Sequence, residues 1–216
     1  MRPFPESRLA FFLPTFGAPC HTCPMSADLI IEIYTDGACS PNPGRGGYGV
    51  IIVQNGRRWE LSGGFRKTTN NRMEILAAIE GLKGVTAGQK AGLEITIFSD
   101  SRYLVDMFNE GHARRWRAKG WMRGPKDRAK NEDLWGSLLD LAAGQGVKFV
   151  WVKSHNEHPE NERCDQLAVE ARQLAALPPD EPYENPPPQT VPIAPLPRPV
   201  RPVPPCEHQQ TLFELI

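Results

Sequence analysis

The sequence lacks an excess of charge of either sign, because 25 Lys and Arg side chains balance 25 Asp and Glu side chains in 216 residues. A charged partner would therefore have to be recognised by a local cluster. No apolar run approaches the length needed to cross a bilayer, and no internal repeat is visible. We expect neither a membrane partner nor a repeat array, but one globular domain with appended segments and a monomeric state.

Cysteine is scarce and irregularly spaced. Five cysteines, an odd number, predict no disulfide framework and a reducing compartment, which favours the cytoplasm. Cys20 and Cys23 form one CxxC pair without a second pair, so zinc binding there is disfavoured. The chain also offers no other Cys/His set for zinc.

Residues 1–27 are interpreted as an N-terminal extension. The apolar stretch from Leu9 to Phe16 follows Arg8, which would suit a secretory signal, but it is short and Pro14 interrupts it. We favour a disordered extension, or a chain whose true first residue is Met25.

One buried charge stands out near the start of the expected domain, residues 28–177. Leu29 to Tyr34 is a short apolar run that predicts a strand, and Asp36 follows it before a glycine-rich turn. A carboxylate at the end of a buried strand must be paired or bound to a cation, because desolvating it alone is costly. The alternative is an Asx-turn, since Asp-Gly and the following Ser-Pro-Asn-Pro-Gly are turn formers.

Three further carboxylates stand at the ends of expected elements. Glu74 begins a helix with apolar residues at i, i+3, i+4 and i+7, Asp100 ends an alternating strand, and Asp165 opens a late helix. The apolar positions of these helices are Ile75, Ala78, Ile79 and Leu82 in the first and Cys164, Leu167, Ala168 and Ala171 in the second. Four carboxylates in equivalent places predict one shared acidic site.

The order of elements predicts a mixed α/β domain. Residues 48–54 and 57–65 flank Asn55-Gly56, which is typical of a type I′ hairpin turn. A helix near residues 103–108, another over 132–143 and a strand over 147–152 follow the Asp100 strand.

A basic segment runs from His112 to Lys130 and contains one acidic residue, Asp127. Trp116 and Trp121 are interleaved with its cations, as expected of a surface that binds a sugar-phosphate backbone. Alternatively, the segment is a solvated charged loop that the tryptophans anchor to the domain. Its eight cations are Arg114, Arg115, Arg117, Lys119, Arg123, Lys126, Arg128 and Lys130.

Five stretches together resemble the successive motifs of bacterial type 1 ribonuclease H. They are YTDGACSPNPGRGGYG, TTNNRMEILAAIEGL, IFSDSRYLV, KNEDLW and VKSHNEHPENERCDQLA, and the resemblance covers residues 29–175. It implies the ribonuclease H-like fold, a five-stranded mixed sheet flanked by helices with a basic protrusion. It also implies an endonuclease that hydrolyses the RNA strand of RNA/DNA hybrids, leaving 5′-phosphate and 3′-hydroxyl ends.

The resemblance assigns catalytic roles. Asp36, Glu74, Asp100 and Asp165 would hold two Mg²⁺ ions, with Mn²⁺ as an alternative, and the oxygen ligands suit such hard cations. His155 would be the auxiliary histidine of a loop, although an ordinary surface histidine is the alternative. Another nuclease or strand-transfer enzyme of the same fold, and a non-catalytic hybrid-binding module, remain alternatives to the ribonuclease.

The resemblance also implies contacts to the hybrid. Selecting RNA paired with DNA depends on reading 2′-hydroxyl groups across a shallow minor groove. Two departures bear on these contacts, since Arg102 replaces a usual Gln and His112 a frequent Trp. Asn42 could instead be only a turn residue, and Asn70 only a helix cap. The implied substrate contacts are Cys39, Asn42, Thr69, Asn70, Asn71, Arg102, Arg114, Arg115, Trp116, Arg117, Lys119, Trp121 and Asn131.

The chain ends with a proline-rich region. Thirteen of the 28 residues in 178–205 are proline, which predicts an extended, disordered linker. Residues 206–216 follow it, and Gln209, Leu212 and Phe213 resemble the short motif by which bacterial replication proteins bind the sliding clamp. Docking of these apolar residues on the chain's own domain, and use of the prolines by an aromatic-lined groove, are the alternatives.

Overall fold

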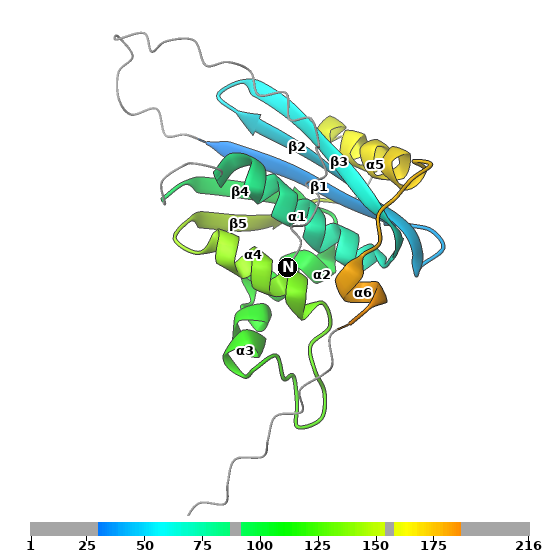
Figure 1. The fold of residues 1–216 in the computed structure, drawn as a ribbon. Helices are drawn as coiled ribbons and strands as arrows, with labels where there is room; N and C mark the ends of the chain where they lie inside the picture. The colour runs from blue at the N-terminus through cyan, green and yellow to red at the C-terminus, as the bar shows by residue number, and fades with distance from the viewer. Residues whose placement is uncertain (1–29, 87–91, 154–157, 187–216) are drawn as a thin grey trace, which may run out of the picture.

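The central feature of the computed structural model is a mixed five-stranded sheet in the order β3-β2-β1-β4-β5 (Figure 1). The structure describes residues 30–86, 92–153 and 158–186. Strands β1, β2 and β3 are antiparallel neighbours, whereas β4 is parallel to both β1 and β5. The predicted mixed sheet is therefore confirmed. The strands are β1 (Ile31–Cys39), β2 (Gly44–Gln54), β3 (Arg57–Thr68), β4 (Glu94–Ser99) and β5 (Gly146–Trp151).

Helices flank the sheet on both faces (Figure 1). On one face of β1, Ile31 and Ile33 belong to the main core together with α1. On the opposite face, Tyr34 packs in a smaller cluster with Cys164 and Leu167 of α5. Within the described part of the chain, no helix is long and apolar enough to span a membrane. The helices are α1 (Asn70–Thr86), α2 (Arg102–Asn109), α3 (His112–Ala118), α4 (Glu132–Ala142), α5 (Pro159–Arg172) and α6 (Glu181–Glu184).

The hairpin between β2 and β3 forms at the dipeptide that the sequence indicated. Asn55 and Gly56 both have positive φ angles, 52° and 72°, as a type I′ turn requires. The antiparallel register continues from Gln54 opposite Arg57 along both strands. Local turn chemistry therefore sets the register of this half of the sheet.

The structure corrects several expected boundaries. Strand β1 does not stop at Tyr34 but continues to Cys39, so Asp36 lies inside a strand instead of following one. Helix α5 begins at Pro159, which places Asp165 in its second turn instead of at its start. The basic segment contains a helix, α3, that the sequence interpretation did not identify.

The expectation that every residue from 178 to 205 is an extended, unpacked linker is wrong for residues 178–186. This C-terminal strap (residues 178–186) carries α6 and lies beside β3 and the start of α1 (Figure 1). The backbone N–H of Arg66 donates to the carbonyl of Pro178 at 2.9 Å, and the Arg66 side chain pairs with Glu184. Asp180 is only 2% exposed, so the strap is part of the domain.

Asp180 belongs to a buried ionic network around Arg72. Arg72 donates to Asp180 through Nε at 2.6 Å and Nη2 at 2.8 Å, and to Asp133 of α4 at 2.9 and 2.7 Å. Thr68 donates its hydroxyl to the same Asp180 carboxylate at 2.7 Å. Bidentate pairing of a guanidinium with two carboxylates compensates for the cost of burying Arg72, which is 3% exposed. The network joins β3, α1, α4 and the strap.

Candidate active site

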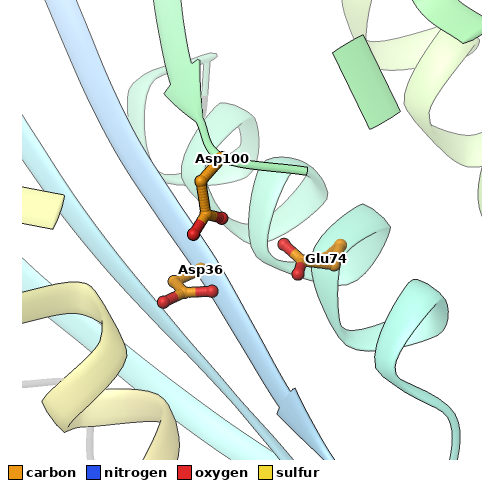
Figure 2. A group of neighbouring side chains, drawn as sticks. All are labelled: Asp36, Glu74 and Asp100. Carbon is orange, nitrogen blue, oxygen red and sulfur yellow. The ribbon is translucent and has the colours of Figure 1, made fainter. Parts of the chain in front are cut away.

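Three carboxylates from different elements converge at the centre of the sheet. Asp36 of β1, Glu74 of α1 and Asp100, which follows β4, each offer a ligand oxygen, and these oxygens all lie within 4.8 Å of one another. Figure 2 shows the three side chains arranged around one small space. Asp36 and Glu74 are 7% and 5% exposed. Three of the four acids that the sequence singled out are therefore brought together.

The sheet topology explains why Asp36 and Asp100 meet. Strands β1 and β4 run in parallel, and their pairing ends at Thr35 opposite Ser99. Asp36 follows Thr35 and Asp100 follows Ser99, so both carboxylates lie at the same end of this strand pair. Parallel strands bring their carboxyl ends to one edge, where ligand sites of open α/β sheets usually lie.

Glycine at position 37 lets α1 approach closely enough to add Glu74. A Cβ atom at Gly37 would lie 2.5 Å from the backbone nitrogen of Glu74 and 2.8 Å from the carbonyl carbon of Met73. Any other residue would therefore push the first turn of α1 away from β1. The Gly37 N–H also donates to Asp36 Oδ1 at 2.7 Å, which orients that carboxylate.

Asp165 stands apart from this group of three. It is partly buried on α5, the helix that packs against the Tyr34 side of β1. By strand alternation Asp36 shares that side of β1, and the charge of Asp165 contributes to the raised pKa of Asp36. Asp165 is thus close enough for its charge to act on the cluster, but its oxygen atoms lie outside the 4.8 Å group.

Burial of like charges perturbs the acids strongly. Desolvation raises the pKa of Asp36 to about 8, the charge of Asp100 adds to the shift, and the hydrogen bond from Gly37 opposes it. Desolvation also raises the pKa of Glu74 well above its usual value, with Asp36 and Asp100 as further causes. The site therefore disfavours its own ionisation unless a cation enters.

The donor set fits a hard divalent cation. All three groups are carboxylates, which are the oxygen ligands that Mg²⁺ prefers. Glu74 Oε1 accepts a hydrogen bond from the Asn70 side chain at 3.1 Å, whereas the buried Oε2 atom has no hydrogen-bond partner among the described residues. A buried carboxylate oxygen without a hydrogen-bond donor in the described part of the chain, such as Glu74 Oε2, is suited to coordinate a metal ion.

The implied substrate contacts near the start of α1 are linked to one another. Asn42 Oδ1 accepts the backbone N–H of Asn70 at 3.2 Å, so Asn42 ties the β1–β2 turn to α1. Asn70 is the first residue of α1, and its side chain donates to Glu74 instead of capping the helix. The Cys39 thiol donates to the carbonyls of Pro41 and Thr68. The Thr69 carbonyl accepts from backbone N–H groups in the first turn of α1.

A second group of the implied contacts lines a cavity of about 430 Å³ beside this region. Asn71, Trp116 and Asn131 all contribute to its wall, together with His112 and Lys130. Asn131 has a left-handed backbone with φ of 59° at the start of α4. Trp116 and Trp121 also pack against the main core, so the anchoring role considered for the tryptophans is present in the structure.

The arginines among the remaining implied contacts each have a neighbouring side chain as a partner. Arg114 lies over the Phe108 ring at 4.9 Å, and Arg115 contacts His112 at 2.8 Å. Arg117 forms an ion pair with Asp140 at 2.6 Å. Lys119 ends α3 as its C-cap residue. Arg102 lies over the ring of Trp151 at 3.6 Å from the centroid.

Some sequence expectations lie outside the described residues. His155 is among them, and so are Gln209, Leu212 and Phe213 of the terminal peptide. Conversely, sequence reasoning missed Trp151, whose indole Nε1–H donates to the backbone carbonyl of Asp100 at 3.1 Å. Its place as the last residue of β5, beside the end of β4, was the available indication.

Comparison with known proteins agrees with this geometry. The family model described as RNase H matches residues 28–173. A ribonuclease H from Rippkaea orientalis is 57% identical over 155 residues, covering 72% of this chain and 93% of the relative. A ribonuclease H from Desulforamulus reducens is 55% identical over 150 residues, covering 69% and 92%. A ribonuclease HI from a Synechocystis species is 50% identical over 144 residues, covering 66% and 88%.

Solved structures show the same fold. The crystal structure of a type 1 RNase H with the type 2 active-site motif has a TM-score of 0.59 and 28% identity, covering 67% of this chain and 72% of that one. The N-terminal RNase H domain of a Mycobacterium tuberculosis protein has a TM-score of 0.52 and 22% identity, covering 67% and 94%. The match of the family model to most of the chain, with several relatives at 50% identity or above, leaves one conclusion. The chain belongs to the ribonuclease H family.

Proposed function

We propose that this enzyme hydrolyses the RNA strand of RNA/DNA hybrids with two Mg²⁺ ions, leaving 5′-phosphate and 3′-hydroxyl ends. The observation that carries the proposal is the buried cluster of Asp36, Glu74 and Asp100 in a member of the ribonuclease H family. Mn²⁺ is the alternative ion. We place the activity in the cytoplasm and assign it to a monomer.

The four acids divide the work of holding the ions. Asp36 would contact both, because it faces Glu74 and Asp100 within the cluster and also senses the charge of Asp165. Glu74 and Asp100 would hold one ion, and Asp165 the other. Bound ions would neutralise the phosphate, lower the pKa of the attacking water and stabilise the leaving 3′ oxygen.

Ionisation of the cluster is coupled to metal binding. The raised pKa of Asp36 and of Glu74 means that protons occupy part of the site at neutral pH without metal. A divalent ion replaces those protons, so metal affinity should increase with pH through the neutral range. His155 would accept a proton from the water or assist product release as a neutral imidazole.

The basic segment and the neighbouring asparagines would hold the hybrid. The short polar groups of Cys39, Asn42, Asn70 and Asn71 lie between the end of β1 and β2 and at the start of α1, near the acids. They would read the 2′-hydroxyls of the RNA strand. Thr69 and Asn131 would hold a phosphate of the DNA strand. The cations and tryptophans of residues 112–130 would bind the same strand, because exposed cations and aromatic faces suit a sugar-phosphate backbone.

One cleavage assay tests the proposal against its alternatives. An RNA/DNA hybrid labelled at one RNA end is incubated with the protein, with and without Mg²⁺, beside single-stranded RNA, duplex RNA and duplex DNA of the same sequence. Metal-dependent cleavage of the RNA strand of the hybrid alone is expected. Binding without cleavage would favour a non-catalytic hybrid-binding module, and cleavage of duplex DNA would favour another nuclease or strand-transfer enzyme of this fold.

A separate proposal concerns the terminal peptide, residues 206–216. Its sequence, with Gln209, Leu212 and Phe213, resembles the motif that enters a hydrophobic cleft of the sliding clamp. Attachment to the clamp would raise the local concentration of the enzyme on replicating DNA. Calorimetric titration of the peptide into the clamp should show binding at about 100 µM or tighter. Loss of binding in a peptide with Leu212→Ala and Phe213→Ala is the control, and no binding of the unchanged peptide contradicts the proposal.

A further inference from the structure

Trp151 is not one of the four acids, but its side chain forms a hydrogen bond with the main chain of one of them, Asp100. The main chain of Asp100 lies in the short junction between β4 and α2. Trp151 ends β5, stands opposite Ser99 in the parallel register, and donates its indole Nε1–H to the carbonyl oxygen of Asp100 at 3.1 Å. This hydrogen bond joins the end of the edge strand to the residue that carries one of the clustered carboxylates.

The rest of the junction is fixed by local hydrogen bonds. The Ser99 hydroxyl accepts the backbone N–H of Ser101 at 3.2 Å, and the Ser101 hydroxyl accepts the N–H of Leu104 as the N-cap of α2. These bonds set the direction in which α2 leaves the sheet. From the end of β5, the Val152 N–H donates to the Ser99 carbonyl at 3.0 Å. The bond from Trp151 differs, because it acts on the carbonyl of Asp100 itself.

Arg102 holds the Trp151 ring from the solvent side. Its guanidinium carbon lies 3.6 Å from the ring centroid, which is the shortest guanidinium-to-ring distance among the described residues. Trp151 is 36% exposed even with Arg102 in place, so the ring lies at the protein surface, where few other groups restrict it. A guanidinium stacked on an indole is favourable both as a cation–π contact and by covering apolar surface. The stack therefore restricts the ring to the orientation in which Nε1–H reaches Asp100.

We propose that Trp151 is a positioning residue for the metal ligand Asp100, and that the main task of Arg102 is to hold Trp151. The inference rests on the proposed function, in which Asp100 binds a divalent ion. Metal ligands must be held within about 0.5 Å of their working positions by neighbouring groups. The contact to the Asp100 carbonyl supplies this support, because displacement of the main chain moves the carboxylate with it.

The first test measures metal binding without nucleic acid. Mn²⁺ is titrated into the whole protein and free Mn²⁺ is followed by electron paramagnetic resonance. Trp151→Phe keeps an aromatic ring under Arg102 but removes the N–H donor, and it should raise the half-saturating Mn²⁺ concentration about 3- to 10-fold. Arg102→Gln should raise it by a smaller factor, and the double variant should show less than the product of the two single effects.

A matched control separates positioning from general loss of structure. Trp59 is an exposed tryptophan on the opposite edge strand, β3, so Trp59→Phe should leave Mn²⁺ binding unchanged. Thermal unfolding of each variant without metal identifies any loss of fold. Arg102 is exposed, so Arg102→Gln is the variant that should keep the native fold in every case.

Activity provides a second readout. If Trp151 positions Asp100, saturating Mg²⁺ should restore the kcat of Trp151→Phe, with the KM for the hybrid near that of the wild type. If Arg102 instead serves mainly as a contact to nucleic acid, Arg102→Gln should raise KM and leave Mn²⁺ binding unchanged, which would overturn the inference. A wild-type protein that neither binds Mn²⁺ nor cleaves would contradict the proposed function itself, whereas wild-type Mn²⁺ affinity in Trp151→Phe would contradict only the role of Trp151.

Discussion

Arg72 and Glu74 are two residues apart near the start of α1, and each belongs to a buried cluster of charged groups. The two clusters compensate for burial in opposite ways. Glu74 meets Asp36 and Asp100, so charges of one sign share a space that water scarcely enters. Arg72 meets Asp133 and Asp180, so opposite charges satisfy one another. The acidic cluster is electrostatically unfavourable without a cation, whereas the Arg72 network is already complete.

The difference separates function from stability along a single helix. Burial first, and the neighbouring carboxylates second, raise the pKa of Asp36 and of Glu74, and a bound cation would relieve that unfavourable state. The Arg72 network fixes the start of α1 against β3, α4 and the C-terminal strap. The Arg72 network therefore holds in place the helix that carries Glu74, whose ionised form is electrostatically unfavourable. Four experiments would break or sharpen this contrast.

The largest effect is expected from Asp36→Asn in the acidic cluster. Cleavage should fall by about 10³-fold or more, because under the proposed function both ions would depend on this carboxylate and their stabilisation of the transition state would be worth several kcal/mol. Binding of the hybrid in Ca²⁺ should be retained or improved, since one negative charge near the phosphate is removed. Steady-state cleavage and equilibrium binding are the measurements. Glu170→Gln, at an exposed position of α5, is the control, and near wild-type turnover of Asp36→Asn would refute the assignment.

The Arg72 network should respond to substitution with loss of stability instead. Asp180→Asn leaves the buried Arg72 with one carboxylate in place of two, and breaking such a pair should lower the free energy of unfolding by about 3 kcal/mol. Urea denaturation of the metal-free protein measures this. Glu184→Gln, which removes the peripheral pair with Arg66, should have a much smaller effect. Equal effects of the two variants would mean that the buried network has no special weight.

Neutralising an acid of the acidic cluster should raise the free energy of unfolding, whereas neutralising Asp180 lowers it. The folded-state pKa of Asp36, about 8, is above the unfolded value near 4, so the folded state binds more protons between these pH values. Metal-free stability should therefore fall as pH rises from about 4 to about 8. Asp36→Asn should flatten this slope and raise the Tm at pH 8, where each kcal/mol of stability gained corresponds to about 2 to 4 °C in a domain of this size. Parallel stability–pH curves for the two proteins would contradict the explanation.

The smallest effect on turnover is expected from the exposed cations of the basic segment, which contrast with the buried acids and would bind phosphates of the hybrid. Replacing Arg114, Arg115, Arg117 and Lys119 by Ala should raise KM more than it lowers turnover. Each lost phosphate contact should reduce the slope of log affinity against log salt by roughly 0.9. Binding measured at several salt concentrations gives the slope, and an unchanged slope would identify the segment as a solvated face.

Local patterns in the sequence predicted most of what forms the acidic cluster. The buried stripe of α1 follows the i, i+3, i+4, i+7 spacing of Ile75, Ala78, Ile79 and Leu82, and all four residues are buried. Apolar strands followed by aspartate located Asp36 and Asp100, because parallel strands that end together place such residues side by side. The continuation of β1 to Cys39 was missed, since its polar and glycine residues form a strand only by pairing with β2.

Other features depend on contacts that sequence patterns do not carry. The prolines of residues 178–186 indicate a chain that cannot form a core, yet Asp180 is buried by binding Arg72. The early start of α5 could have been found, because Pro159 at the first helical turn with Glu160 and Glu162 after it is a typical helix start. The contact between Trp151 and Asp100 follows only from the neighbouring places of β4 and β5 in the sheet.

The ion pair between the C-terminal strap and α1 also has a kinetic consequence. Asp180 and Arg72 are 108 residues apart in the chain, so their contact closes a loop that spans most of the domain. Contacts of such large sequence separation tend to form after the folding transition state. Their free energy then appears in the unfolding barrier, so Asp180→Asn should accelerate unfolding with little change in the folding rate. The strap would thus set the lifetime of the native enzyme.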